Sequence, residues 1–136
     1  MLTSFFKNLK RGLERLGNYP VILGGDWNCT VSTDLAKDNI DCLNMSHSPN
    51  TRHSILLQNL CTDFNMSDPY RVLYPHRKDY TFCPRSVLAI NKSRIDFFII
   101  SNSIAPAVTE CDIMPGLQSK LFDHKAITLE FNKKKG

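Results

Sequence analysis

The chain has 136 residues, of which 42% are hydrophobic and 22% charged; this composition suits one globular domain with a real core and excludes an intrinsically disordered protein. Its net charge of +4 is a mild basic bias, which is compatible with a polyanionic partner but does not identify one. The five cysteines are odd in number and no two form a CxxC pair, so we expect reduced thiols rather than a disulfide framework or a zinc site, and no apolar run approaches the length of a membrane span.

The start of the chain predicts an amphipathic helix followed by a buried strand. Apolar residues recur at helical spacing, at Phe6, Leu9, Leu13 and Leu16. Ser4 can cap the start of this helix and Gly17 can end it. Residues 21–23 (Val-Ile-Leu) form a short continuous apolar run, which suits a strand covered on both faces.

The middle of the chain predicts a loop and a second helix. Residues 29–51 are polar and lack a clear period, so we interpret most of them as loop. Residues 52–64 predict a helix whose apolar stripe is Ile55, Leu56, Leu60 and Phe64, with Leu57 and Cys61 alongside. Asp68 and Pro69 then begin a short turn or helix that ends near residues 74–75.

The remainder of the chain predicts β structure. Residues 80–82, 94–100, 108–114 and 126–131 read as strands, and residues 84–92 read as a loop or hairpin arm. The order helix, strand, helix and four strands predicts an α/β fold, with a mixed sheet and helices packed on one face.

A glycine pair and two polar residues follow the first predicted strand, in residues 25–28 (Gly-Asp-Trp-Asn) and the preceding Gly24. Glycines let the backbone turn sharply or approach a ligand closely. Asp26 and Asn28 are two residues apart, so in an extended strand their side chains point to the same side and could hold a metal-bound phosphate or a water. The alternative is a turn in which Asp and Asn make local backbone hydrogen bonds.

Asp96 lies directly against the apolar residues 97–100 and therefore needs a partner, because burying an unpaired carboxylate is costly. Arg94 is one candidate partner and a histidine is another. The alternative is a structural ion pair at the edge of a sheet.

His124, next to Asp123, precedes the last strand, and a histidine held by Asp96 can act as a base toward water. We interpret the other three histidines as loop or surface residues, namely His47, His53 and His76.

Residues 68–82 combine aromatic residues, prolines and positive charge, including Arg71. This combination could support contacts to a DNA backbone. A structured connection that contributes tyrosine and phenylalanine to the core is equally compatible with it.

In this order the motifs resemble the C-terminal half of the endonuclease/exonuclease/phosphatase family, and most closely the apurinic-type endonuclease domain of LINE (non-LTR) retrotransposons. Residues 25–28 are similar to the family's GDxN motif, residues 93–98 to its SRIDY segment and residues 122–124 to its SDH motif. Residues 68–82 are similar to the D-x-W-R…P…Y-T-F segment of LINE enzymes. The resemblance covers residues 21–131.

The resemblance implies the C-terminal half of a four-layer, DNase I-like α/β sandwich and a Mg²⁺- or Mn²⁺-dependent endonuclease. Such an enzyme would nick target DNA for retrotransposition, in the nucleus of the cell. The residues it implies in catalysis are Asp26, Asn28, Asp96 and His124. The metal would lie at Asp26 and Asp123. Contacts to DNA would come from Arg71, Thr81, Lys92 and Arg94.

The sequence departs from the family pattern in three places. Trp27 replaces a phenylalanine, Phe122 replaces the serine before Asp-His, and the family's N-terminal half with its metal-binding glutamate is absent. We therefore expect one truncated domain, with residues 1–19 as a leading helix, 20–131 as its core and 132–136 as a basic tail. Half of a two-sheet fold leaves one sheet face uncovered. We expect this chain alone to be inactive or nearly so, and to associate with a missing N-terminal half or a second copy.

Two alternatives stay open at this point. One is a non-catalytic remnant that binds nucleic acid or a partner protein. The other is a different phosphoesterase of the same superfamily, acting on phosphoinositides or nucleotides.

Overall fold

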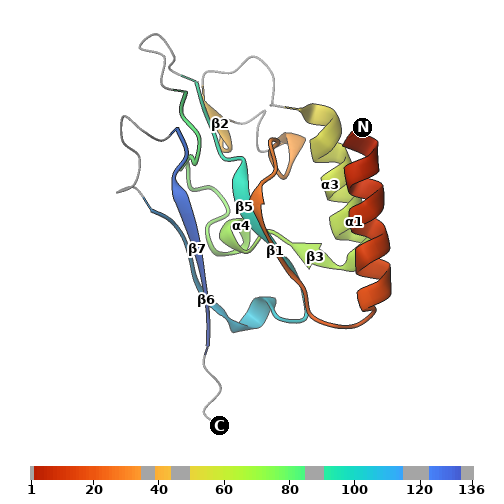
Figure 1. Cartoon of the computed structure of the whole chain (residues 1–136). Coiled ribbons are helices and arrows are strands. Elements are labelled where there is room, and N and C mark those ends of the chain that lie inside the picture. Colours follow the sequence, from red (N-terminus) through yellow and green to blue (C-terminus); the bar gives the residue numbers. More distant parts are fainter. Residues whose placement is uncertain (1, 35–38, 44–49, 85–90, 115–122, 133–136) are drawn as a thin grey trace.

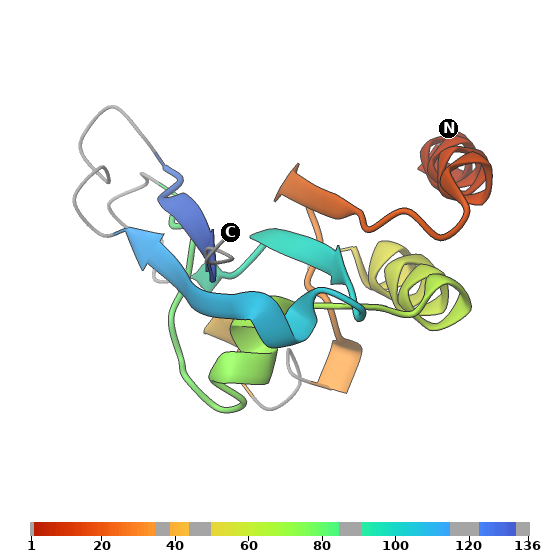
Figure 2. The ribbon, with the colours of Figure 1, turned by 90° about the horizontal axis from the view of Figure 1, so that it is seen from below.

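The computed structural model describes residues 2–34, 39–43, 50–84, 91–114 and 123–132. Two longer helices lie side by side and form one side of the molecule, and a β-hairpin lies on the other side of a small central sheet (Figures 1 and 2). The helices and strands, in chain order, are α1 (Leu2–Leu16), β1 (Ile22–Asp26), β2 (Cys42–Leu43), α3 (Thr51–Phe64), β3 (Met66–Ser67), α4 (Pro69–Leu73), β4 (Lys92–Ser93), β5 (Asp96–Ser101), a 3-10 turn (Ala105–Ala107), β6 (Val108–Met114) and β7 (Ala126–Phe131).

The central sheet has the strand order β1-β5-β3, and β2-β4 and β6-β7 form separate two-stranded ladders. This confirms the predicted α/β class and the last two predicted strands. Every described strand pair is antiparallel, so the parallel pairs that a mixed sheet would contain are not found in the described ranges. Residues 80–82 do not form the predicted strand; within them Phe82 alone makes isolated bridges, to Ser93 and to His124.

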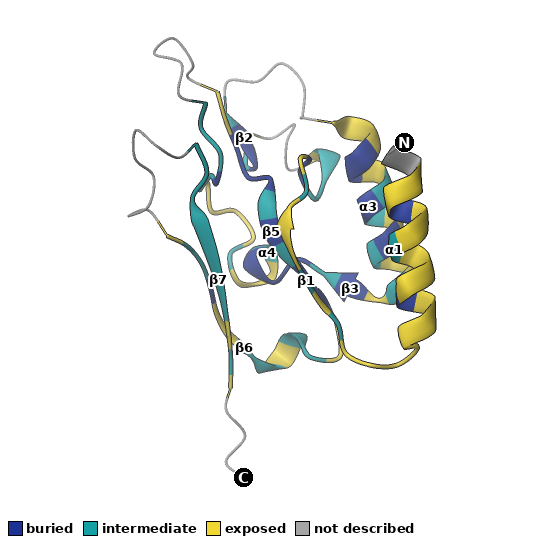
Figure 3. Cartoon of the chain, viewed as in Figure 1, coloured by how far each residue is buried: buried dark blue, intermediate teal, exposed yellow. Residues whose placement is uncertain are grey.

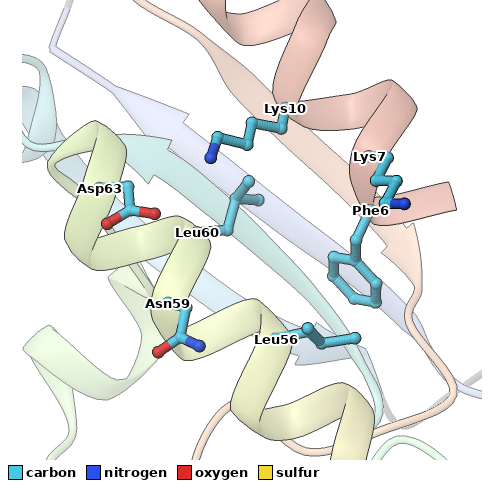
Figure 4. Close-up of a pocket in the computed structure, with 7 residues that line it drawn as sticks. All are labelled: Phe6, Lys7, Lys10, Leu56, Asn59, Leu60 and Asp63. Carbon is cyan, nitrogen blue, oxygen red and sulfur yellow. The ribbon is translucent and has the colours of Figure 1, made fainter. Parts of the chain in front are cut away.

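The two helices bury their apolar faces against one face of β5. Phe6 and Leu13 of α1 and Leu57 and Leu60 of α3 enclose a core with Phe97 and Ile99, of which Ile99 is fully buried. Burial of such side chains contributes about 1.5–3 kcal/mol each. A shallow groove of about 270 Å³ remains between the helices (Figure 4). The groove is lined by Phe6, Lys7, Lys10, Leu56, Asn59, Leu60 and Asp63.

Three details of the helix predictions are wrong. Ser4 lies inside α1 rather than capping it, because the helix already begins at Leu2. Ile55 of α3 is 47% exposed, whereas His53, predicted at the surface, is buried against Phe6. The buried side of α3 is formed by its residues 53, 54, 57 and 60, which leaves Ile55 outside it. The rest of the predicted stripe is confirmed, because Leu56, Cys61 and Phe64 pack against the core. Gly17 ends α1 as predicted, in the left-handed region at φ 59°.

The first strand is not covered on both faces. Ile22 is 49% exposed, and most of β1 is open to solvent (Figure 3). A hollow of about 510 Å³ lies beside the strand, between it and the start of α1. The hollow is lined by Phe5, Leu9, Ile22, Leu23, Gly24, Gly25, Asp26 and Trp27. The apolar run therefore forms the predicted strand but lacks the second cover that its composition indicates.

All five cysteines are free, as predicted, and Cys29, Cys42 and Cys111 are buried. Across the described ranges there is no helix of the length and apolar character that a membrane crossing requires. Several sequence features lie outside the described residues, namely His47, most of the predicted loop 84–92, Phe122 and the basic tail from residue 133.

Candidate active site

Asp26 and Asp96 are paired across the central sheet, where β1 ends and β5 begins. Gly24 allows this pairing because a Cβ atom at that position would lie 2.7 Å from the ring of Phe98, its partner on β5. Gly25 has a φ of 151°, which side chains of other residues rarely tolerate. The two glycines thus let β1 run closely along β5 and deliver Asp26 to the same sheet edge as Asp96.

The chain turns directly after Asp26. Asn28 adopts a left-handed conformation with φ 54°, and its backbone N–H donates to Asp26 Oδ1 at 2.9 Å. This is the local turn that the sequence offered as the alternative for residues 25–28. The second oxygen, Oδ2 of Asp26, lies 4.0 Å from Nε2 of His124. The motif therefore makes its turn and also directs one carboxylate oxygen toward the histidine.

Asp96 holds His124. Oδ2 of Asp96 lies 2.9 Å from Nδ1 of His124, so the partner that Asp96 requires is the histidine and not Arg94. A carboxylate can only accept, and Nδ1 must therefore donate, which leaves the lone pair of a neutral ring on Nε2. The ring of Phe82 packs against the imidazole at a centroid distance of 4.7 Å. The imidazole is fixed on one edge, while its Nε2 edge faces Asp26.

Asp26, Asp96 and His124 form one group, whose potential ligand atoms all lie within 4.8 Å of one another. The side chain of Asp26 is 49% exposed, whereas that of Asp96 is 13% exposed and bound to the imidazole. A hard divalent cation such as Mg²⁺ prefers carboxylate oxygens and keeps several waters, so the open carboxylate of Asp26 fits it. Asp123 does not belong to this group, although its backbone carbonyl accepts the Cys83 amide at 3.0 Å nearby.

Arg94 lies in a buried network of ion pairs. Its guanidinium contacts Asp41 at 2.8 Å and also Asp68, and Asp41 in turn contacts Arg71. Burial lowers the pKa of the Arg94 guanidinium, but the charges of Asp68 and Asp41 more than reverse this effect and raise it. The side chain of Arg94 is 1% exposed, so its charge is used in ion pairs inside the protein.

Three of the four residues that the sequence predicts to contact DNA have side chains that are engaged within the protein. Arg94 and Thr81 are fully buried, and Arg71 binds Asp41 and two backbone carbonyls. Direct contact with a phosphate needs an accessible donor, which these side chains do not offer. Lys92 is exposed and remains available. Nothing in the sequence distinguishes Asp41 from its neighbours, because it lies in an aperiodic polar segment.

Neither a scan of protein-family models nor a search of curated proteins found a match to this chain. Solved structures do match. The 3′-5′ exonuclease NExo from Neisseria meningitidis aligns with 97% of this chain and 52% of its own, at TM-score 0.76 and 20% identity. A second structure of NExo, described there as a 3′ phosphatase, is bound to a product DNA hairpin.

Two further structures have the same fold. The AP endonuclease LMAP from Leishmania major aligns with 94% of this chain and 43% of its own, at TM-score 0.75 and 21% identity. The endonuclease domain of TRAS1, a telomere-specific non-LTR retrotransposon, aligns with 98% of this chain and 53% of its own, at TM-score 0.70 and 16% identity.

The chain therefore has the DNase I-like α/β fold that the sequence predicted, and it spans about half the length of the structures it matches. These matches include an exonuclease, an AP endonuclease and a retrotransposon endonuclease domain, which is the range of proteins that the motif resemblance indicated. At these identities the likeness defines the fold, and function has to be argued from the site.

Proposed function

We propose that this chain supplies the water- and phosphate-binding side of a metal-dependent DNA endonuclease centre, which nicks target DNA during retrotransposition. The observation that carries the proposal is the alignment of Asp26, His124 and Asp96 at one sheet edge, with separations of 4.0 Å and 2.9 Å. A nuclease acting on chromosomal DNA would work in the nucleus.

His124 would act as the base or as the phosphate contact. Its Nε2 carries the free lone pair and lies too far from Asp26 Oδ2, at 4.0 Å, for a direct hydrogen bond. A water molecule can bridge this gap, because its two O–H groups can donate to the Nε2 lone pair and to the Asp26 carboxylate. Asp96 stabilises the imidazolium that forms when Nε2 takes a proton.

Asp26 would hold the divalent cation, Mg²⁺ or Mn²⁺, through its exposed carboxylate. When bound, such an ion polarises the phosphate and lowers the pKa of a coordinated water. The roles proposed for Asn28 and Asp123, to bind the phosphate and to assist the metal or the leaving group, rest on the motif resemblance alone. DNA as the substrate is supported by the nuclease structures of the same fold, one of which contains DNA, and by the net charge of +4.

The centre proposed here is incomplete. One open carboxylate is a weak anchor for Mg²⁺, which enzymes usually hold with further carboxylates or substrate phosphates. We therefore expect the chain alone to cut DNA very slowly or not at all. The exposed hollow beside β1 favours a second candidate function, in which the chain is a non-catalytic remnant that binds a partner there.

Nicking of a supercoiled plasmid with Mg²⁺ or Mn²⁺ tests the proposed endonuclease centre and its expected incompleteness. His124→Ala is the informative variant, and His76→Ala is its matched control because His76 is exposed and lies outside the Asp26, Asp96 and His124 group. Weak nicking that His124→Ala removes and His76→Ala keeps would support the endonuclease centre. Robust nicking with the same dependence would overturn the expected incompleteness. A lack of Mg²⁺ or Mn²⁺ binding by calorimetry in the millimolar range would leave the non-catalytic alternative.

A further inference from the structure

Thr81 joins the two segments that carry Asp96 and His124. Its side chain is fully buried, and its hydroxyl oxygen accepts the amide of Ile95 at 3.1 Å and that of Asp96 at 3.1 Å. Its backbone carbonyl accepts the amide of Lys125 at 2.7 Å. One residue is therefore bound to Asp96 on one side and to the neighbour of His124 on the other.

The hydroxyl binds the backbone where the chain passes from β4 to β5, two strands of different sheets. β4 ends at Ser93 and β5 begins at Asp96, so Arg94 and Ile95 lie outside both strands. The Arg94 amide is bound by the backbone carbonyl of Asp41 at 2.8 Å. The next two amides, of Ile95 and Asp96, both reach the Thr81 hydroxyl. Buried amides without a partner are costly, so this oxygen stabilises the backbone from which the Asp96 side chain extends.

The residues after Thr81 fix His124 in the same way. Phe82 forms a bridge with His124 and packs its ring against the imidazole, and the Cys83 amide donates to the carbonyl of Asp123 at 3.0 Å. Phe82 also pairs with Ser93, at the end of β4. Residues 81–83 thus hold the Asp96 and His124 segments in one register.

We propose that Thr81 is a positioning residue, whose hydroxyl holds Asp96 where its carboxylate can select the Nδ1–H form of His124. The inference rests on the function proposed for the Asp96–His124 pair, but the tautomer of His124 can be measured without any cleavage. It replaces the direct DNA contact that the sequence predicted for Thr81. The oxygen that was expected to meet a phosphate is instead the acceptor for two backbone amides.

The ¹⁵N shifts of the two imidazole nitrogens of His124 report the tautomer, and they can be measured at pH 8. Wild type and Thr81→Ser, which keeps the hydroxyl, should show the Nδ1–H form. Thr81→Val, which has the same shape without the acceptor, should show a mixture with the Nε2–H form. Thr30→Val is the matched control, since Thr30 is also fully buried and its hydroxyl contacts Ser32 and Ser54 instead. It should keep the wild-type shifts.

Unchanged shifts in Thr81→Val, or the same change in Thr30→Val, would overturn the proposal. If Thr81→Val does not fold, hydrogen exchange of the wild-type protein decides. The amides of Ile95 and Asp96 should then be protected about tenfold or more over unbonded amides, and unprotected amides would contradict the hydrogen bonds. A protein that passes these tests but binds neither Mg²⁺ nor Mn²⁺ in the millimolar range would contradict the endonuclease function and leave the positioning role intact.

Discussion

Asp26, the last residue of β1, lies directly opposite Asp96, the first residue of β5. The two carboxylates reach the same histidine from different sides, because Asp96 binds Nδ1 of His124 while Asp26 faces Nε2. Like charges at such positions repel one another, and an imidazole or a cation between them reduces the repulsion. The pairing of two strand ends therefore creates a site that favours positive charge and can take a metal ion beside a base.

The buried ion pairs of Asp41 should dominate stability among the charges of the described residues. Asp41→Asn removes the carboxylate that pairs with both Arg71 and Arg94 and leaves Arg94 with Asp68, and we expect the free energy of unfolding in urea to fall by about 3–5 kcal/mol. Asp79→Asn is the control, since Asp79 pairs with Lys125 at 4.0 Å near the surface, and should cost at most about 1 kcal/mol. Equal losses in both variants would contradict the assigned role of the network.

Gly24 and Gly12 should respond in opposite directions to alanine. Gly24→Ala places a methyl group 2.7 Å from the Phe98 ring, so we expect a loss of about 1–3 kcal/mol in unfolding free energy. Gly12 lies in α1 with no atom within 4 Å of an added Cβ, and Gly12→Ala should stabilise by about 0.5–1 kcal/mol. Thermal unfolding of both variants checks the prediction. A neutral Gly24→Ala would show that β1 does not run closely along β5.

The cysteine thiols should make the fold less stable in alkali. Burial raises the pKa of Cys29, Cys42 and Cys61 from 9.0 to about 11, so the folded protein keeps their protons where the unfolded chain loses them. Their contribution to stability is complete below pH 9 and is lost as the pH rises through 11. Urea midpoints at pH 8 and pH 10.5 measure the loss. Cys29→Ala should show a smaller decrease than wild type, and an equal decrease would argue against this cause.

Association should depend on the uncovered side of β1. Ile22 is 49% exposed on a strand that has a partner on one edge among the described residues, and such edges pair readily with other chains. We expect the apparent mass in light scattering to rise with concentration, and Ile22→Arg to suppress the rise. Val72→Arg, at an apolar position on α4 that is 61% exposed, should not suppress it. A wild-type chain that stays monomeric up to millimolar concentration would be evidence against this prediction.

Local patterns predicted much of the fold. Local residue patterns predict β6 and β7 as strands, and helical spacing of apolar residues predicts α1 and α3. These four elements occur close to the predicted positions. That Asp96 has a partner was predictable because a carboxylate beside an apolar strand needs one. The sequence left Arg94 and a histidine open, and the partner is His124. What failed depends on distant contacts. Asp41 and Arg94 are 53 residues apart in sequence, and no local pattern predicts an ion pair over that separation.

Exposure was the other property that the sequence could not give. The apolar run before Gly24 predicts a strand, but nothing within the run states whether a second layer covers it. His53 illustrates the same limit, since the rotation of α3 that buries it is decided by packing against Phe6. Thr81 was assigned to DNA from its motif, whereas its burial directs it to the Asp96 backbone.

The most direct test of the central claim is the NMR spectrum of the chain during a titration with Mn²⁺, which broadens the signals of nearby nuclei. If Asp26, Asp96 and His124 form one cation site, their amide signals should broaden first, at millimolar Mn²⁺ or below. Asp26→Asn should abolish this selective broadening, while Asp63→Asn, at an exposed position on α3, should preserve it. Broadening that is uniform over the protein, or that survives Asp26→Asn, would contradict the claim.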